Sequence, residues 1–335
     1  MTNPPAPARY PLSWQQELAE AITDPAELLR QLDLPGTLLA PAREAGRDFR
    51  LRVPQGYVDR MRRGDAADPL LRQVLPLADE LVPRPGYLSD PVGDLDAMTT
   101  PGLLHKYHGR ALLVTTGACA VHCRYCFRRH FPYGEANPAR EDWQGAIDYL
   151  HRDPSVTEII LSGGDPLVLS NARLARLLAA LANIPHLRRL RIHTRLPVVL
   201  PARIDAGLLD LLGGNRLRPV MVVHANHANE FDAAVGQALA GLRAGGVLLL
   251  NQAVLLRDVN DSVAAQAGLS EALFDHGVQP YYLHLLDRVQ GAAHFDVTEA
   301  EARVLIDGLR ARLPGYLVPR LVREIAGEPG KHPIA

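Results

Sequence analysis

Residues 111–133 read ALLVTTGACAVHCRYCFRRHFPY and contain all three cysteines of the chain, Cys119, Cys123 and Cys126, in the spacing C-x3-C-x2-C. The apolar run of residues 111–116 predicts a β-strand that leads into the cysteines. Three thiolates on one short loop can bind three irons of a cubane 4Fe-4S cluster, whereas electron-carrier clusters of this type usually have four cysteine ligands. Because the chain has no fourth cysteine, the spacing predicts a cluster with one iron open to a further ligand.

Two other interpretations of the cysteines remain open at this point. A structural zinc ion takes four ligands, and His122 or His130 would be the fourth. The thiols would otherwise be small buried apolar groups without a ligand. The strand before the cysteines and a glycine-rich loop after the next strand favour the cluster. This arrangement resembles the radical S-adenosylmethionine (SAM) superfamily, in which the open iron binds the amino and carboxylate groups of SAM.

The composition excludes several classes of protein. The chain is 47% hydrophobic and 22% charged, as is usual for a soluble globular protein. Its 36 Lys and Arg and 37 Asp and Glu give a net charge of −1, so we expect no nucleic-acid partner. No apolar run approaches the roughly 18 residues of a membrane span, and residues 1–14 lack the features of a signal peptide. An odd number of cysteines in one loop argues for a reducing compartment, so we expect a cytoplasmic protein with no membrane contact.

The pattern of apolar residues divides the chain into three parts. Residues 1–98 have apolar side chains at helical spacing and predict a helical appendage with a linker. Residues 99–316 predict strands that alternate with helices, and residues 317–335 form a C-terminal segment. Six strand–helix units predict an α/β fold, an incomplete (βα)6 barrel, which is also the fold that the radical SAM resemblance implies. Such barrels carry their functional residues at the C-terminal ends of the strands. The predicted strands are Ala111–Thr116, Thr157–Ser162, Arg189–Thr194, Pro219–His224, Val247–Leu255 and Pro280–Leu286.

A glycine-rich loop, Ser162-Gly163-Gly164-Asp165, follows the second predicted strand. Two adjacent glycines let the backbone approach a ligand closely, and a carboxylate accepts hydrogen bonds from an ammonium group. A tight turn between strand and helix is the alternative. Within a radical SAM barrel, Gly163, Gly164 and Asp165 match the motif that binds the amino group of SAM.

Polar side chains also follow later strands. His224 and Asn226 lie at the end of the fourth strand, and Gln252 lies within the apolar fifth strand. A buried amide without a partner costs about 1–3 kcal/mol, which suggests a ligand, although an amide satisfied within the fold is the alternative. We assign these three residues to the SAM side of the site.

Two further groups of residues carry little information by themselves. Lys106, Tyr107 and Arg110 lie just before the cysteine strand, where cations are usually solvated. Lys331 ends the sequence GEPGK and, taken alone, would be a lysine of a terminal tail. Together with the cluster motif, however, this loop resembles the lysine 2,3-aminomutase family, whose members combine SAM chemistry with pyridoxal 5′-phosphate (PLP) on a lysine. The resemblance covers nearly the whole chain.

The aminomutase resemblance implies a role for each of these positions. Lys331 would carry PLP, and Arg110, with Lys106 and Tyr107 nearby, would contact its phosphate. Arg128 falls where the family binds the substrate carboxylate, a group that pairs well with a planar guanidinium. The two acidic residues that hold the distal ammonium of lysine would be Asp287 and Glu324. The implied enzyme is an isomerase that moves the nitrogen of L-lysine from C2 to C3.

Departures from the free-lysine enzymes narrow the resemblance to one subgroup. Glu324 stands where those enzymes have aspartate, His284 replaces an aromatic residue, and the sequence stops at Ala335 without a clostridial-type extension. With the segment LHLLDRVQGAAHF, these features resemble the enzymes that make (R)-β-lysine for elongation factor P. This implies a functional link to that factor and its ligase, and a flavodoxin or ferredoxin as electron donor. The alternatives are a metabolic aminomutase that makes (S)-β-lysine and a non-enzymatic iron–sulfur sensor or electron carrier.

Overall fold

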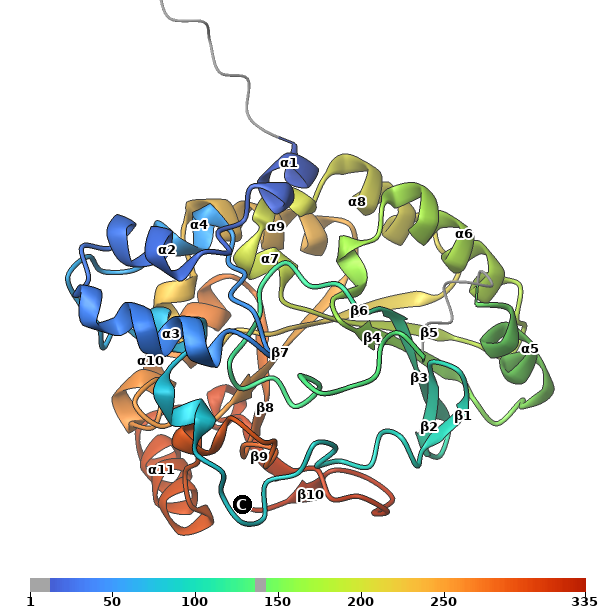
Figure 1. Cartoon of the computed structure of the whole chain (residues 1–335). Helices are drawn as coiled ribbons and strands as arrows, with labels where there is room; N and C mark the ends of the chain where they lie inside the picture. Colours follow the sequence, from blue (N-terminus) through green and yellow to red (C-terminus); the bar gives the residue numbers. More distant parts are fainter. Residues whose placement is uncertain (1–12, 136–142) are drawn as a thin grey trace, which may run out of the picture.

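A computed structural model describes residues 13–135 and 143–335 of the chain. These residues form one ten-stranded sheet in the order β1 to β10, so each strand pairs with its neighbours in sequence. Strands β3 to β9 are parallel, whereas the pairs β1–β2, β2–β3 and β9–β10 are antiparallel. Figure 1 shows the strands arranged around the centre of the molecule and the longer helices on its outer side.

The parallel strands carry the predicted barrel. They are β3 (Arg110–Thr116), β4 (Glu158–Gly163), β5 (Arg189–Thr194), β6 (Arg218–Val223), β7 (Leu248–Val254), β8 (Gln279–His284) and β9 (Arg320–Arg323). The six strands expected from the sequence are β3 to β8, and the prediction of an incomplete parallel barrel is confirmed. The central residues of β4 are all buried, whereas buried and partly exposed residues alternate in β5 and β7, as expected where one face packs on helices and the other lines a cavity.

The sheet extends beyond the predicted strands at both edges. The additional elements are β1 (Met98–Thr100), β2 (Leu103–Tyr107), the parallel strand β9 and β10 (His332–Pro333). In β2 only Leu103 and Leu104 are buried, and the following residues are polar or charged. Such short segments lack the apolar run by which a buried strand is recognised in a sequence. The two extensions matter because β2 carries Lys106 and the β9–β10 hairpin carries Lys331.

Helices alternate with the parallel strands. They are α5 (Gln144–Arg152), α6 (Asn171–Ala182), α7 (Leu196–Val199), α8 (Ala206–Gly213), α9 (Ala233–Ala244), α10 (Val263–Asp275) and α11 (Glu299–Arg312). Several begin at a side chain that caps the helix. Ser170, Asp205 and Asp232 each accept a hydrogen bond from a backbone N–H of the first helical turn. The helix boundaries therefore follow local side-chain chemistry.

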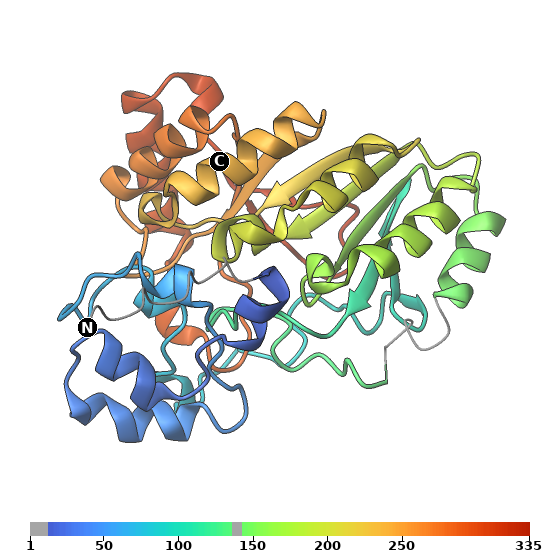
Figure 2. The same ribbon diagram turned by 90° about the horizontal axis from the view of Figure 1, so that it is seen from above.

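The N-terminal region consists of short helices that pack against one side of the barrel, as Figure 2 shows. They are α1 (Trp14–Ala19), α2 (Pro25–Gln31), α3 (Leu39–Ala45) and α4 (Gln55–Val58), with single 3-10 turns at Gly36–Leu38, Leu71–Gln73 and Ala78–Leu81. Leu28, Tyr57 and Leu70 from this region belong to the same buried apolar cluster as the barrel core. The region is therefore part of a continuous hydrophobic core.

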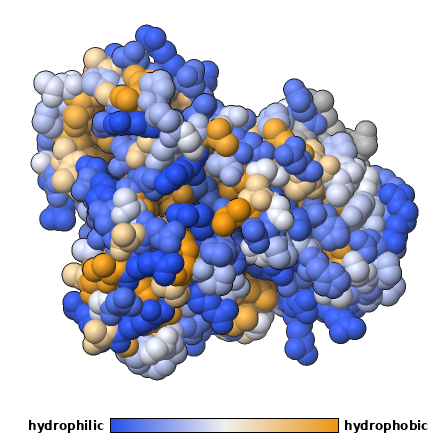
Figure 3. Space-filling view, turned by 90° about the horizontal axis from the view of Figure 1, so that it is seen from below, coloured by the Kyte–Doolittle hydropathy of each residue, from blue (hydrophilic) through white to orange (hydrophobic). Residues whose placement is uncertain are grey.

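Hydrophilic and hydrophobic residues are interspersed on the surface seen in Figure 3. Within residues 13–135 and 143–335, no helix is long and apolar enough to cross a membrane.

Candidate active site

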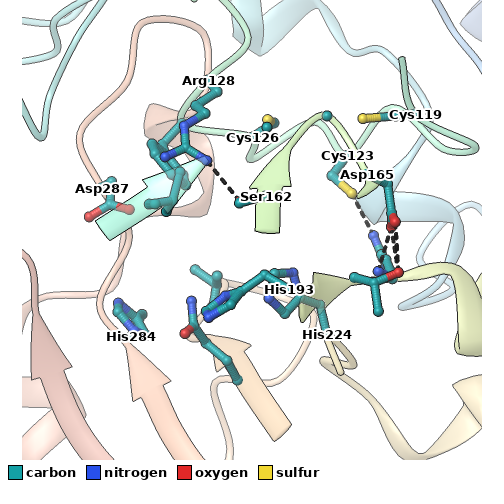
Figure 4. Close-up of a pocket in the computed structure, with 18 of the residues that line it drawn as sticks. Cys119, Cys123, Cys126, Arg128, Ser162, Asp165, His193, His224, His284 and Asp287 are labelled. Atoms are coloured by element: carbon teal, nitrogen blue, oxygen red, sulfur yellow. Dashed lines mark hydrogen bonds between the residues drawn. The ribbon is translucent and has the colours of Figure 1, made fainter. Parts of the chain in front are cut away.

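One cavity of about 530 Å³ lies at the C-terminal ends of the parallel strands. Every site residue predicted from the sequence lines it. These residues are Lys106, Tyr107, Arg110, Cys119, Cys123, Cys126, Arg128, Gly163, Gly164, Asp165, His224, Asn226, Gln252, Asp287, Glu324 and Lys331. Figure 4 shows the three cysteines on one side of this space, and Arg128, Asp287 and the histidines around the rest of it. The fold thus brings together residues from β2 through the β9–β10 hairpin.

The cysteine loop leaves the end of β3 and is held against the N-terminal region. The backbone N–H of His122 donates to the carbonyl of Arg52 at 2.9 Å, and that of Arg124 donates to the carbonyl of Gln73 at 2.9 Å. The three cysteines carry free thiols, and burial raises the pKa of Cys126 to about 11. Such thiols lose their protons readily only when a metal supplies compensating positive charge. The loop therefore has the donor set and surroundings that suit an iron–sulfur cluster.

The two histidines considered as zinc ligands have other partners. Nδ1 of His122 lies 2.8 Å from the carbonyl oxygen of Arg50, and its ring stacks on Phe49 at 5.1 Å between centroids. Nε2 of His130 lies 3.3 Å from the carbonyl oxygen of Gln290. Among the described residues, no three His, Cys, Asp or Glu side chains are grouped as ligands of a single metal ion.

The glycine-rich loop after β4 packs directly on the cysteine loop. The N–H groups of Gly164 and Asp165 donate to the carbonyls of Thr116 and Ala118 at 2.7 and 2.8 Å. A Cβ atom on Gly164 would lie only 2.2 Å from the oxygen of Ala118, and Gly163 adopts a positive φ of 117°. Glycine is thus needed at both positions to bring the two loops together.

Asp165 is more deeply engaged in the fold than the sequence suggests. Its carboxylate accepts hydrogen bonds from Oγ1 of Thr194 at 2.7 and 2.9 Å and from the N–H groups of Arg195 and Leu167. Burial raises the pKa of Asp165 to about 6. The carboxylate therefore joins β4 to the end of β5, and a contact with the ammonium of SAM remains a prediction.

The side chain of Asn226 has hydrogen-bond partners within the fold, whereas the nearby histidines have buried nitrogen atoms without a partner in the described part of the chain. The Asn226 amide donates to Gln73 and to the Tyr125 hydroxyl at 3.0 and 2.7 Å and accepts from the N–H of Val254 at 2.8 Å. In contrast, several buried polar atoms have no hydrogen-bond partner within the described residues. Among them are Nε2 of His193, His224 and His284 and Oε1 of Gln252, all from residues that line the cavity. Buried atoms of this kind usually have a partner, so they indicate a ligand that fills the cavity.

The same histidines are uncharged. Burial, followed by the nearby Arg195, lowers the pKa of His224 to about 4, and burial also lowers the pKa values of His193 and His284. The rings of His193 and His224 meet edge to face, with centroids 5.5 Å apart. His193 was not predicted from the sequence, because a histidine within a strand is not distinguishable from one that is satisfied in the core.

A chain of alternating charges crosses the other side of the cavity. Arg128 donates through Nε to Asp94 at 2.6 Å, and Asp94 also pairs with Lys106 at 2.6 Å. Lys106 and Lys331 in turn each lie 3.0 Å from the carboxylate of Glu324. Asp94 is only 2% exposed. It was not predicted because it lies in a turn-rich segment with several acidic residues, where charges are usually solvated.

The guanidinium of Arg128 is held in a defined orientation. Besides its bond to Asp94, Nη1 donates to Oγ of Ser162 at 3.0 Å. Within the described part of the chain, its Nη2 atom makes no hydrogen bond, so this edge of the fork is available to a carboxylate in the cavity. Arg110 lies with its guanidinium 4.7 Å from the centre of the Tyr107 ring, and the amine of Lys331 lies 5.7 Å from that of Tyr282.

Two carboxyl groups in the cavity have opposite electrostatic surroundings. Burial opposes ionisation of Glu324, but Lys331 and Lys106 lower its pKa to about 2. Burial and the neighbouring Glu324 raise the pKa of Asp287 to about 7. Asp287 makes no ion pair within the described residues. The cavity thus contains a carboxyl group that a cationic ligand would ionise and neutralise.

Comparisons with known proteins agree with this geometry. Residues 113–218 match the Radical SAM superfamily. Over 96% of its length, the chain is 53% identical to the L-lysine 2,3-aminomutase of Escherichia coli K12, of which 94% is covered. It is 48% identical to the L-lysine 2,3-aminomutase of Haemophilus influenzae, with 95% and 94% covered, and 41% identical to that of Buchnera aphidicola, with 99% and 98% covered.

Proposed function

Because the chain belongs to the L-lysine 2,3-aminomutase family of radical SAM enzymes, we propose that this isomerase converts L-lysine to β-lysine with PLP as a second cofactor. The observation that supports lysine best is the unpaired carboxyl group of Asp287 in a cavity that also holds Arg128 and Lys331. In an amino acid with a distal ammonium group, the carboxylate complements Arg128 and the ammonium complements Asp287.

The cofactors of the proposed reaction have candidate ligands at separate parts of the cavity. Cys119, Cys123 and Cys126 would hold a 4Fe-4S cluster, as expected for a radical SAM enzyme, and SAM would lie between this cluster and the uncharged histidines. Lys331 would carry PLP, with Lys106, Tyr107 and Arg110 near its phosphate; their cationic groups suit that anion. When bound, the cluster and SAM supply a radical that removes hydrogen from carbon, and PLP holds the migrating nitrogen.

Residues of the chain would position the substrate by charge. Arg128, oriented by Asp94 and Ser162, would bind the α-carboxylate through its free edge. Asp287 and Glu324 would bind the distal ammonium, whose burial is costly without such pairing. The surrounding neutral histidines provide hydrogen bonds without adding positive charge beside that ammonium. Exclusion of water by the filled cavity would protect a reactive carbon radical.

We further propose that the product is (R)-β-lysine for the modification of elongation factor P, with a flavodoxin or ferredoxin as electron donor. The sequence features around Glu324 and His284 favour this subgroup. The second candidate is a metabolic aminomutase that makes (S)-β-lysine. Both candidates need the same cavity, so the stereochemistry of the product distinguishes them.

The experiment is chiral analysis of the product of anaerobically reconstituted protein supplied with L-lysine, SAM, PLP and a chemical reductant. We expect (R)-β-lysine, and no product from Lys331→Ala, which should also lose the visible absorbance of bound PLP. Formation of (S)-β-lysine would support the metabolic alternative. Turnover by Lys331→Ala equal to that of the native protein would contradict the proposed role of PLP.

A further inference from the structure

A buried guanidinium contacts one of the three cysteines directly. Arg195 follows the last residue of β5 and is 4% exposed. Its Nη1 atom lies 2.8 Å from Sγ of Cys123, the contact drawn as a dashed line at Cys123 in Figure 4. Burial of a charge is costly unless that charge is paired and hydrogen-bonded. The remaining contacts of Arg195 are therefore informative.

The other end of the Arg195 guanidinium is held by three residues. Nη2 donates to the hydroxyl of Tyr57 at 2.9 Å, to Oε1 of Gln73 at 2.6 Å and to Oε2 of Glu230 at 3.0 Å. Tyr57, Gln73 and Glu230 are all fully buried. Of these partners, only Glu230 carries a negative charge. Arg195 and Glu230 thus form an ion pair whose cationic end faces Cys123.

Glu230 is fixed in its turn by neutral donors. Its Oε1 atom accepts from the backbone N–H groups of Asn226 and His227 at 2.8 and 3.1 Å and from Nε2 of Gln73 at 3.2 Å. The pair therefore cannot rotate away from Cys123 without breaking several buried hydrogen bonds. This arrangement fixes the positive end of the ion pair beside Cys123, a predicted iron ligand.

We propose that Arg195 is a positioning residue for the cluster and that the Arg195–Glu230 pair sets the cluster's reduction potential. One-electron reduction adds a negative charge to the cluster, and the electron comes from an external donor. A cation that also hydrogen-bonds a ligating sulfur stabilises the reduced state, whereas a nearby carboxylate opposes it. The inference depends on the cluster expected for the family and not on the identity of the amino-acid substrate.

Two substitutions separate this role from a purely structural one, because they should shift the midpoint potential of the cluster in opposite directions. Arg195→Met removes the cation and the bond to sulfur, so the midpoint potential should become more negative. Glu230→Gln keeps a hydrogen-bond acceptor but removes the anion, so the potential should become more positive. Tyr57→Phe, which removes one neutral acceptor of Arg195 and keeps both charges, is the matched control and should shift the potential least.

The measurement is a redox titration of reconstituted full-length protein with titanium(III) citrate, followed by electron paramagnetic resonance, in the absence of SAM. Iron and sulfide analysis of each variant comes first. If Arg195→Met fails to retain a cluster, Arg195→Lys replaces it. The midpoint potential of Arg195→Lys should be more negative than that of the native protein.

Shifts of the same sign in the arginine and glutamate variants, or no shift in either, would overturn the inference. The titration is then repeated with SAM added, and a shift that appears only in this second titration would also overturn the inference, because Arg195 would then act on SAM. In contrast, native protein that binds no cluster at all would refute the proposed function itself. The two failures are therefore distinguishable.

Discussion

Asp287 and Glu324 show how the same functional group acquires different properties within one cavity. Glu324 is paired with two lysines and stays ionised to low pH, whereas Asp287 forms no ion pair within the described residues and has a pKa of about 7. The difference comes from the positions of Lys106 and Lys331, both 3.0 Å from Glu324. Arrival of an ammonium group would make the two carboxylates more alike, since a close cation lowers the pKa of a carboxyl group.

The pKa of Asp287 predicts a pH dependence of lysine binding. Only the ionised carboxylate pairs with an ammonium, and the side-chain ammonium of lysine stays charged to about pH 10. The KM for lysine should therefore fall as the pH rises from about 6 to 8, as Asp287, whose pKa is about 7, ionises. Asp287→Asn should have a higher KM that lacks this dependence. Steady-state kinetics from about pH 6 to 8 test this prediction. An equal change of KM with pH in the native protein and in Asp287→Asn would contradict the role of Asp287.

The same pKa fixes the sign of a stability effect. The usual value for aspartate is 3.8, and in the folded chain it is raised to about 7. Between these values the folded protein holds a proton that the unfolded chain has released. The stabilisation of the folded state by the protonated Asp287 is thus complete below about pH 4 and is lost as the pH rises through about 7. Bound lysine favours the ionised carboxylate, so in its presence the stability of the folded protein should no longer fall with rising pH.

A second prediction at the residue scale concerns Arg128. Arg128→Lys keeps a positive charge but loses the planar fork that Asp94 and Ser162 orient. Charge-assisted hydrogen bonds contribute about 1.5–3 kcal/mol each, so kcat/KM for lysine should fall by about tenfold or more. Iron, sulfide and PLP contents should stay near those of the native protein. Loss of the cluster in this variant would show that Arg128 is structural.

At the scale of elements, the sequence predicts those strands and site residues that are marked by apolar runs or by local motifs. Most of the strands β3 to β8 were recognisable by consecutive apolar residues, and β5 by the alternation of apolar and polar residues. The cysteine and glycine motifs mark the C-terminal ends of β3 and β4. Strands β2 and β9 were missed because they are short and partly charged. Asp94 was missed for a different reason: its role depends on Arg128 and Lys106, which only the folded chain brings within hydrogen-bond distance.

The contact between the cysteine loop and the glycine-rich loop gives a prediction at this scale. Gly164→Ala would place a Cβ atom 2.2 Å from the backbone oxygen of Ala118, so the two loops must separate. We expect the variant to fold but to retain much less iron and to bind SAM more weakly. Gly134→Ala is the control, because its Cβ would meet no atom of the described residues within 4 Å. Iron analysis and equilibrium binding of SAM test the prediction, and equal iron contents in the two variants would contradict it.

At the scale of the whole molecule, the N-terminal region is joined to the cysteine loop by a buried charge cluster. Glu80 accepts from Arg124 at 2.8 Å through Nε and from Arg129 at 2.8 Å, and Arg124 is fully buried. The guanidinium of Arg124 also lies 4.8 Å from the centre of the Phe49 ring. Removal of the shared carboxylate would leave two buried cations without compensation, which is the costly case for a buried ion pair.

Glu80→Gln should therefore destabilise the protein by about 3–5 kcal/mol. It should also release the N-terminal region from the cysteine loop before the barrel unfolds. Denaturant unfolding of the cluster-free protein measures the first effect, and hydrogen exchange of the N-terminal helices measures the second. Glu299→Gln, which removes an exposed partner of Arg303, should change stability little. Equal effects of the two substitutions would contradict the prediction.

The strictly sequential strand order has a consequence for biosynthesis. Each strand pairs with the one made just before it, so the sheet can grow by one strand at a time as the chain emerges. A nascent chain that has reached Glu230 already contains the three cysteines and Arg195, whereas Lys331 lies near the far end of the sequence. The cluster half of the cavity can thus assemble during translation before the half around Lys331, which is completed only after the β9–β10 hairpin has emerged from the ribosome.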